Sequence, residues 1–340
     1  MKRHSSNKVT SHEVAALAGV SRSAVSRTFT EGASVSAKTR EKVLNAAAEL
    51  GYRPNALARS LIVRSTQMVG LVMAEWKNPF YTRMLRQFSE RLQAEGYQLL
   101  LLTSNTETDV DDAVRRLLQY QVDGLLVVSA KPSEALAREC ANTGTPVVLV
   151  NRLAKKLQAS SVTCDNAQIG RDTVEHLVAA GYQRLALVRG APGVLTNIER
   201  SDAIRTALAA APGAKLVADV TGYLGYDAGR QVVAELWNSA APPDAIICSS
   251  DPTALGVLDG ARIDLGIDVP EQLAVVGMGD IPQSGWGAYR LTTVHLPVDE
   301  MIDLAVADLL ARLADPGLPP RPMIAHATLV NRDTVRSSHS

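Results

Sequence analysis

From Met68 onward the chain repeats one pattern, in which a short apolar run is followed by a segment with apolar residues at helical spacing. The apolar runs are 69–73, 98–103, 124–128 and 146–150, and the amphipathic segments between them are 81–95, 112–120 and 133–141. Strands that alternate with helices predict a parallel sheet with helices on both of its faces.

The same pattern then starts again, which predicts a second sheet of this kind. Its expected strands are 161–164, 184–188, 215–220, 245–248 and 273–276, and its expected helices are 167–180, 198–211, 226–237 and 252–265. Three more elements are expected at 292–296, 298–313 and 324–329. Two doubly wound α/β sheets in series predict a two-lobed body, with a ligand-binding cleft at the carboxyl ends of the strands.

Charge separates the first 66 residues from this body. The 340 residues contain 35 basic and 35 acidic side chains. Residues 1–66 hold eleven Lys and Arg against four Asp and Glu, a net charge of +7, and the other 274 hold 24 against 31, a net charge of −7. A small basic segment on an acidic body predicts a polyanion such as DNA as the partner of that segment.

The basic segment predicts a small all-α domain of three short helices. Thr10 and Glu13 have the spacing of a capping box, and Gly19 is expected to end the first helix. Ser21 and Ser36 are expected to cap the second and third. The expected inward residues are Val14, Leu17, Ala18, Val25, Phe29, Val43, Ala46, Ala47 and Leu50. Two helices joined by a short glycine-containing turn indicate a helix-turn-helix.

The outward side of the second helix carries Arg22, Ser23, Ser26 and Arg27. Short polar side chains and arginines at a helix N-terminus suit the major groove, where Arg binds guanine through two hydrogen bonds. The alternative is a solvated amphipathic helix in a small bundle. The local charge of +7 and the glycine turn favour contact with DNA.

Several other classes of protein are not expected. No apolar run approaches the roughly 18 residues that span a bilayer, and the polar N-terminus lacks an export signal, so the chain is expected in the cytoplasm. Cys140, Cys164 and Cys248 are odd in number and far apart, which predicts reduced thiols. The histidines lack metal-ligand spacing, and no metal or cofactor is expected. An enzyme is not expected, because a Gly-x-Ser-x-Gly elbow is absent and the Gly-Met-Gly at 277–279 lacks the third glycine of a dinucleotide-binding loop.

Five stretches of the basic segment together form a specific signature. They are 9–15 (VTSHEVA), 18–21 (AGVS), 25–27 (VSR), 35–43 (VSAKTREKV) and 50–61 (LGYRPNALARSL). This signature resembles the DNA-binding domain of the LacI/GalR family of bacterial transcription regulators, without a gap over about 55 residues.

The resemblance implies a role for each matched residue. Arg22 and Ser23 take the leading base-reading positions of the recognition helix, and Arg27 lies one turn further on. Residues 55–63 match the hinge helix of the family, and Leu61 matches the leucine that is wedged into the minor groove to kink the duplex. The expected DNA contacts are Thr10, Ser21, Arg22, Ser23, Ser26, Arg27, Asn55, Ala58, Arg59 and Leu61.

The body resembles the type I periplasmic-binding-protein fold that serves as the sensor of the same family. Its marks include 78–80 (NPF), 123–125 (DGL), 165–166 (DN), 269–270 (VP) and 291–294 (LTTV). The resemblance implies three crossings between the lobes, near 160–163, 294–297 and 323–327. The expected divisions are 1–54 for the helix-turn-helix domain, 55–66 for the hinge helix and linker, and 67–340 for the effector-binding and dimerisation domain. In that last domain, one lobe takes 67–161 and 296–324, and the other takes 162–295 and 325–337.

The chain is therefore identified as a member of this family and is expected to be a repressor that binds a palindromic operator as a homodimer. A small-molecule effector in the cleft is expected to control its affinity for DNA. The alternative is the solute-binding protein of a transporter, which the basic segment and the missing export signal disfavour.

The resemblance also implies which residues bind the effector. They are Phe80, Asn151, Arg152, Thr196, Arg200, Ser250, Asp251, Gly279, Asp280 and His295. Sugar-binding members of the family use acidic or amide side chains at three of these positions, where this chain has Asn151, Ser250 and Gly279.

Two arginines of the expected cleft are kept, Arg152 and Arg200. Guanidinium groups without the usual carboxylates predict an anionic effector, such as a sugar acid, another hydroxy acid or a sugar phosphate. The alternative is a neutral sugar, with the arginines neutralised by Asp165, Asp251 or Asp280.

Overall fold

The computed structural model of this protein describes residues 9–30, 32–53, 65–73, 78–104, 107–154, 157–190 and 195–337, with the backbone alone at 107–108 and 195–197. The chain divides into two compact units, Met1–Thr66 and Gln67–Ser340. Each unit has a hydrophobic core of its own, which is what defines a structural domain.

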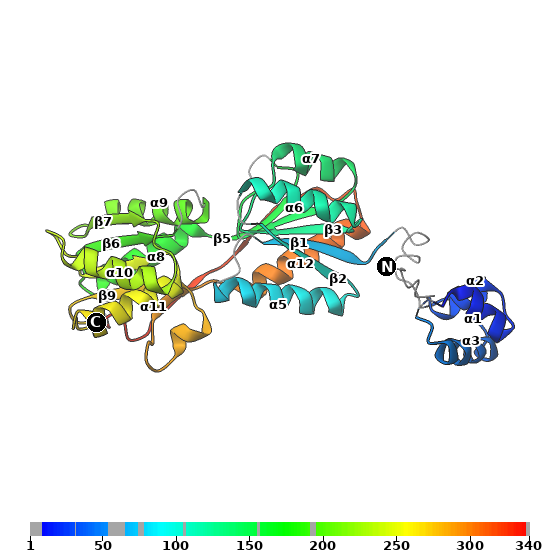
Figure 1. Cartoon of the computed structure of the whole chain (residues 1–340). Coiled ribbons are helices and arrows are strands. Elements are labelled where there is room, and N and C mark those ends of the chain that lie inside the picture. The colour runs from blue at the N-terminus through cyan, green and yellow to red at the C-terminus, as the bar shows by residue number, and fades with distance from the viewer. Residues whose placement is uncertain are drawn as a thin grey trace, which may run out of the picture. The chain divides into compact units, whose positions relative to one another are not determined.

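The first unit consists of three short helices, α1 (Ser11–Ala18), α2 (Arg22–Thr28) and α3 (Ala37–Leu50) (Figure 1). The predicted capping box is present at α1, where the Thr10 amide donates to Oε2 of Glu13 at 2.7 Å. Gly19 and Gly51 end α1 and α3 at φ +64° and +65°. Glycine adopts this left-handed conformation without the steric cost that a side chain brings.

The core of the first unit is small and aliphatic. Its buried members are Val14, Ala15, Ala18, Val25, Val43, Ala46 and Ala47. The prediction for Leu17 was wrong, because the face of α1 that meets the other helices runs through positions 14, 15 and 18 and leaves Leu17 48% exposed. Phe29 and Tyr52 close the edge of this core with ring centroids 5.8 Å apart.

The second unit contains two sheets of six strands each. The first has the order β11-β5-β4-β3-β1-β2. Its strands are β1 (Met68–Met73), β2 (Gln98–Thr103), β3 (Gly124–Val128), β4 (Val147–Val150), β5 (Ser160–Cys164) and β11 (Pro322–Ala325), and all of its pairs are parallel. Helices α5 (Pro79–Ala94) and α12 (Val298–Ala314) cover one face, and α6 (Glu107–Gln119) and α7 (Glu134–Asn142) cover the other (Figure 1). This sheet and its helices are called the first lobe.

The second lobe is built in the same way. Its sheet has the order β12-β10-β9-β8-β6-β7, and only β12 runs antiparallel to its neighbour. The strands are β6 (Arg184–Arg189), β7 (Lys215–Thr221), β8 (Ala245–Cys248), β9 (Ala274–Gly279), β10 (Thr292–His295) and β12 (Thr328–Val330). The helices are α8 (Asn166–Ala179), α9 (Leu195–Ala210), α10 (Tyr226–Trp237) and α11 (Asp251–Asp259), and a π-helical turn (Gly260–Asp264) continues α11. The predicted fold class, a helical head and an α/β body of two parallel sheets, is confirmed.

Three differences from the expected elements concern the passages between the lobes. The strand expected to open the second sheet, β5, instead pairs with β4 and β11 in the first. The single strand expected at 324–329 is two strands, β11 and β12, which belong to different sheets. The chain therefore passes between the sheets after Cys164, after His295 and after Ala325. These passages differ from the expected lobe boundaries by a few residues, because backbone pairing rather than the apolar run decides which sheet a strand joins.

Helices α10 and α11 pack with their backbones in contact. A Cβ on Gly256 would lie 1.9 Å from the carbonyl oxygen of Tyr226, and one on Gly229 would lie 2.1 Å from that of Thr253. Only glycine fits at both positions, so this helix pair places the start of α11 rigidly beside the sheet.

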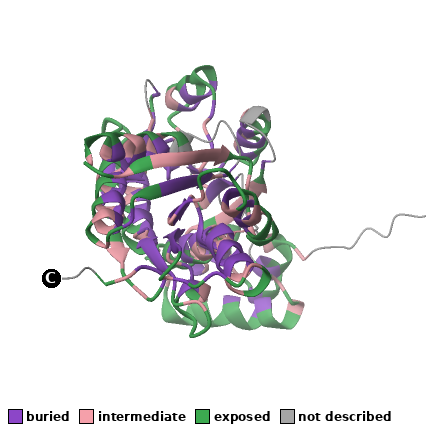
Figure 2. Cartoon of the chain, turned by 90° about the vertical axis from the view of Figure 1, so that its left-hand side faces the viewer, coloured by how far each residue is buried: buried purple, intermediate pink, exposed green. Residues whose placement is uncertain are grey.

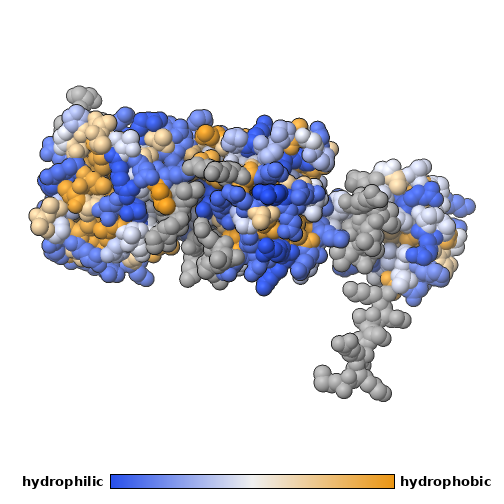
Figure 3. Space-filling model, turned by 90° about the horizontal axis from the view of Figure 1, so that it is seen from above, coloured by the Kyte–Doolittle hydropathy of each residue, from blue (hydrophilic) through white to orange (hydrophobic). Residues whose placement is uncertain are grey.

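The cores of the body are aliphatic because aromatic residues make up only 4% of the chain. Figure 2 shows buried residues inside the layers and exposed residues on the outer helix faces. The surface in Figure 3 is largely hydrophilic, with apolar side chains in separate patches. Among the residues that the structure describes, no helix is long and apolar enough to cross a membrane.

Candidate functional site

Helix α2 presents one polar and basic face. Arg22, Ser23, Ser26 and Arg27 are all exposed, as is the capping residue Ser21. The opposite face buries Ala24, Val25 and Thr28 against the other helices. The exposed set is therefore the one that the sequence predicted for contact with DNA. Thr10, at the start of α1, is exposed as well.

Local hydrogen bonds hold this helix and its side chains. The hydroxyl of Ser21 accepts from the Ala24 amide at 3.2 Å, which caps the helix. Nε of Arg27 donates to the Ser23 carbonyl at 3.3 Å, so this side chain lies along its own helix. Nη1 of Arg40 in α3 donates to the Thr28 carbonyl at 3.1 Å and ties the end of α2 to α3. A rigid helix with exposed Ser and Arg side chains has the hydrogen-bond donors to bind phosphates and base edges.

Some predicted residues lie outside the described part of the chain. They are Asn55, Ala58, Arg59 and Leu61 of the expected hinge helix. Thr196 lies in α9, where its backbone alone is described.

In the body, three residues that directly follow parallel strands have left-handed backbones. They are Ser129 after β3 (φ +54°), Asn151 after β4 (φ +58°) and Asp280 after β9 (φ +50°). Such backbones are uncommon outside glycine and concentrate at ligand-binding sites. The backbone thus turns sharply at a polar residue at the carboxyl ends of strands in both lobes. Open α/β sheets bind ligands at this edge.

A chain of hydrogen bonds joins the two lobes at these strand ends. In the first lobe, the Ser129 hydroxyl donates to Tyr81 Oη at 2.9 Å, and Nδ2 of Asn151 donates to the Ser129 hydroxyl at 2.9 Å. Oδ1 of Asn151 accepts from Nη2 of Arg200, on α9 of the second lobe, at 3.4 Å. Nε of Arg200 donates to Oδ1 of Asn166 at 3.0 Å. The structure therefore brings the predicted pair Asn151 and Arg200 into direct contact across the lobes.

Arg200 is only 7% exposed, and burial lowers the pKa of its guanidinium. Arg152, which follows Asn151, is also buried, at 8% exposed. A buried guanidinium has lost its hydration and needs strong hydrogen-bond acceptors in return. Both arginines are therefore buried cations rather than surface charges.

Asp251 was predicted to face the ligand, but its surroundings are those of a core residue. It is completely buried. Its carboxylate accepts from the Thr293 hydroxyl at 2.5 Å, the Ser284 hydroxyl at 2.7 Å and the Ile281 amide at 2.9 Å. Burial raises the pKa of Asp251, and these three donors act in the opposite direction. The carboxylate thus holds the loop after β9 against β10 and α11.

Asp280 is bound on both sides by positive or polar groups of the second lobe. Oδ1 accepts from Nη2 of Arg332 at 2.7 Å, and Oδ2 lies 2.9 Å from Nδ1 of His295. Burial acts to raise the pKa of Asp280, but the bonds from Arg332 and His295 outweigh it, and the pKa is lowered. The structure thus places the predicted residues Asp280 and His295 in one cluster.

Gly279 has a backbone conformation that residues with a side chain rarely adopt. Its φ is +137°, and a Cβ there would lie 3.6 Å from Oδ2 of Asp251. A carboxylate at this position would therefore strain the backbone and meet a second carboxylate. This local conformation favours glycine over an acidic residue at 279.

The other two predicted residues are buried near helix starts. Phe80 is 6% exposed at the start of α5, and its ring meets that of Tyr81 edge-on at 5.1 Å. Ser250 is 6% exposed at the start of α11, with its hydroxyl 3.0 Å from that of Thr253. Phe80 is the sequence neighbour of Tyr81, and Ser250 is the sequence neighbour of Asp251.

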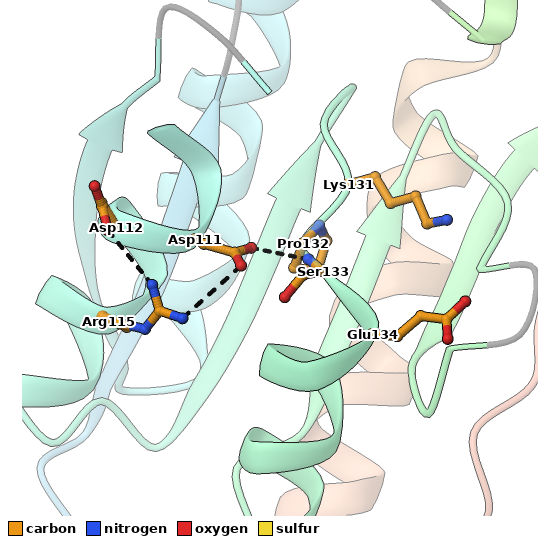
Figure 4. Close-up of a pocket in the computed structure, with 7 residues that line it drawn as sticks. All are labelled: Asp111, Asp112, Arg115, Lys131, Pro132, Ser133 and Glu134. Carbon is orange, nitrogen blue, oxygen red and sulfur yellow. Dashed lines mark hydrogen bonds and ion pairs between the residues drawn. The ribbon is translucent and has the colours of Figure 1, made fainter. Parts of the chain in front are cut away.

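A separate hollow of about 470 Å³ lies between the starts of α6 and α7 in the first lobe (Figure 4). Its polar groups bind one another: the Ser133 amide donates to Oδ1 of Asp111 at 2.8 Å, and Arg115 pairs with Asp111 and Asp112. Lys131 and Glu134 complete its wall. It contains none of the residues that the sequence predicted for ligand binding.

Sequence reasoning did not select Ser129, Asn166 or Arg332. Ser129 directly follows β3, and Asn166 lies two residues after the end of β5. A polar residue just after a predicted strand is a signal of a ligand-binding position that the sequence offers. Arg332 comes from the C-terminal segment and reaches Asp280 only through the fold, so its sequence neighbourhood carries no such signal.

Comparison with known families and proteins gives consistent matches along the chain. Residues 10–55 match the family described as bacterial regulatory proteins of the lacI family, and residues 66–279 match the family described as periplasmic binding proteins and sugar-binding domain of the LacI family. The HTH-type transcriptional regulator AscG of Escherichia coli (strain K12) is 31% identical over 330 residues, 95% of this chain and 97% of that protein.

Two solved structures extend the comparison to the fold. A crystal structure of the lac repressor dimer bound to operator and the anti-inducer ONPF has a TM-score of 0.87 at 26% identity, and the match covers 96% of this chain and 99% of that one. A complex of the transcriptional regulator CelR with cellobiose has a TM-score of 0.69 at 30% identity, again with coverage of 96% and 99%.

We predict that Asp251→Asn destabilises the body, because an amide NH2 would face donors that now bind a carboxylate. The expected loss in the free energy of unfolding is about 1–3 kcal/mol. Urea titration followed by circular dichroism measures it. Asp264→Asn, which breaks an exposed ion pair with Arg230, is the matched control and is expected to have a much smaller effect. Equal midpoints for the two variants would contradict the structural role of Asp251.

Proposed function

The chain belongs to the LacI family of bacterial regulatory proteins, and from this premise we propose that it is a transcriptional repressor whose affinity for an operator is set by a small-molecule effector. The observation that carries the proposal is the exposed face of α2, with two arginines and two serines on a helix that is capped and packed from behind. Its relatives AscG and CelR are transcriptional regulators by name. A protein with this role acts where the chromosome is, which is the bacterial cytoplasm.

We propose that Arg22, Ser23 and Arg27 read base edges in the major groove, while Thr10, Ser21 and Ser26 bind phosphates. Arg binds guanine in bidentate fashion, and hydroxyls near a helix start bind backbone oxygens. The expected hinge residues Asn55, Ala58, Arg59 and Leu61 extend this interface into the minor groove, where an apolar wedge kinks the duplex.

The proposed oligomer is a homodimer, and an exposed apolar patch on the second lobe supports it. Its members are Leu224, Tyr226, Ile263 and Trp286, with exposed fractions of 50%, 37%, 72% and 56%. Two hydrogen bonds hold the elements of this patch together: Tyr226 Oη donates to Oδ2 of Asp259, and Arg262 donates to the Ala288 carbonyl at 3.0 Å. Large apolar side chains on one surface mark a protein contact, and a second copy gives the two-fold symmetry that a palindromic operator requires.

The proposed effector site lies between the lobes, at the hydrogen-bond chain from Tyr81 to Arg200. A ligand there would contact both lobes and bias their relative orientation. The three passages between the lobes give that orientation a hinge, and the first lobe continues directly into the segment that leads to the DNA-binding domain. A ligand changes DNA affinity only to the extent that it binds the two orientations with different affinities.

We predict that selection on random DNA enriches an inverted repeat, and that Arg27→Ala weakens binding to it by about 1–3 kcal/mol and relaxes one base position. The Ser23 carbonyl bond of Arg27 is lost as well, so the circular dichroism of the variant must match that of the parent. Lys38→Ala, at the start of α3, serves as the control for loss of positive charge and is expected to weaken binding to all sequences alike. Failure to enrich any inverted repeat would overturn the proposal.

We predict that Ile263→Asp shifts the protein from dimer to monomer in sedimentation equilibrium and weakens operator binding, because it places a charge in the apolar patch. Leu318→Asp is the matched control, since Leu318 is 40% exposed in a turn after α12. An unchanged dimer in the Ile263 variant would contradict the assignment of this patch to the dimer contact.

We predict that the operator and the effector change each other's affinity by one common factor, because linkage is reciprocal. The expected factor is about 5–150. It is measured by titrating the effector with and without saturating operator, and the operator with and without saturating effector. Identical effector dissociation constants in both conditions would refute control of DNA binding by that ligand.

A further inference from the structure

We infer that the effector carries an anionic oxygen group, a carboxylate or a phosphate, which binds the buried guanidinium of Arg200. This inference rests on the proposed function, because it names the chemical class of the molecule that binds between the lobes. It goes beyond that function, since a neutral ligand would serve the same regulatory scheme.

Arg200 has neutral hydrogen-bond acceptors among the described residues. Its hydrogen bonds to described residues go to two amide oxygens, Oδ1 of Asn166 at 3.0 Å and Oδ1 of Asn151 at 3.4 Å. Across the part of the chain that the structure describes, no carboxylate lies within ion-pair distance of it. Arg200 is nevertheless 7% exposed. A buried cation held only by neutral acceptors is costly, because a charge that leaves water needs an opposite charge to offset its lost hydration.

Several carboxylates of the second lobe are bound by other groups of the protein. Asp251 is completely buried and accepts three hydrogen bonds from its own loop and strand. Asp280 is bound by Arg332 and His295. Glu199 accepts from Nδ2 of Asn166 at 3.0 Å.

At the end of β9, a side chain at position 279 would strain the backbone. Gly279 has a φ of +137°, and a side chain there would approach Asp251. At the end of β4, the residue that meets Arg200 is Asn151, whose amide group donates to Ser129 and accepts from Arg200. Among the described residues, neither of these two strand ends therefore supplies a carboxylate that hydrogen-bonds to Arg200.

A carboxylate or a phosphate group fits the guanidinium of Arg200. A guanidinium presents its N–H donors in one plane, which matches the two oxygens of a carboxylate or two oxygens of a phosphate. The 3.4 Å bond to Asn151 is long for a hydrogen bond, so Nη2 exchanges it at small cost for a charged acceptor. Arg152 adds a second buried guanidinium one residue beyond Asn151. An anion between the lobes would thus replace a weak neutral contact with a charge-assisted one.

The first experiment needs no knowledge of the ligand. Asn151→Asp in the full chain places a carboxylate on Nη2 of Arg200 with almost no change of shape, and Ser129 and Tyr81 accommodate it by reversing the direction of their hydroxyl bonds. We expect this variant to raise the melting temperature of the ligand-free protein. Asn142→Asp, on the exposed end of α7, makes the same change of net charge away from Arg200 and is expected to leave it unchanged. A lower melting temperature for Asn151→Asp than for Asn142→Asp would overturn the inference.

The second experiment measures melting temperature with defined probes at equal ionic strength. The probes are glucose, gluconate, glucose 6-phosphate, formate, inorganic phosphate and, as the reference, sodium chloride. We expect anionic probes to stabilise the parent beyond chloride and beyond glucose, with at least about tenfold weaker apparent binding to Asn151→Asp. Comparing the stabilisation by formate and gluconate with that by inorganic phosphate and glucose 6-phosphate distinguishes a carboxylate ligand from a phosphate ligand.

Three results would overturn the inference: stabilisation by glucose alone, no anion effect beyond chloride, or an anion effect that Asn151→Asp leaves unchanged, which would indicate an adventitious ion only. These results leave the DNA selection untouched. A chain that enriches an inverted repeat but ignores the anionic probes remains a regulator with a neutral effector, whereas a chain that binds anions and enriches no repeat loses the proposed function itself.

Discussion

The body of this protein depends on the three passages of the chain between its two sheets. Because β5 and β11 complete the first sheet while β10 and β12 lie in the second, neither sheet is made from one continuous stretch of sequence. Each lobe is thus completed by a later segment of the chain, which returns to it from the other lobe. Of the three left-handed residues at strand ends, Ser129 and Asn151 lie in the first lobe and Asp280 lies in the second.

Within this frame, two buried polar residues differ in the partners that surround them. Asp251, with three donors around it, is a structural group that fixes the loop between β9 and β10. Among the described residues, Arg200 hydrogen-bonds only to two neutral amide oxygens. The contrast matters because burial by itself does not distinguish a ligand-binding residue from a core residue. The number and the charge of the partners do.

The DNA-binding unit follows simpler rules. Its helices begin at capping residues and end at left-handed glycines, and its core consists of small aliphatic residues. These are local features, so a short chain adopts them with few long-range contacts. Because one face of α2 is packed against the other helices, its exposed arginines all lie on the opposite face.

The sequence by itself determined the helix starts, the alternation of strands and helices, and the outward position of Arg22 and Arg27, because capping and periodicity act over a few residues. The family resemblance predicted Asn151, Arg200, Asp280 and His295 as effector-binding residues, and the structure brings Asn151 to Arg200 and Asp280 to His295. The sheet to which β5 belongs, the burial of Asp251, the exposure of Leu17 and the part played by Arg332 were decided only by the tertiary structure. Each of these depends on a contact between residues far apart in the chain, and such a contact leaves no periodic mark in the sequence around either partner.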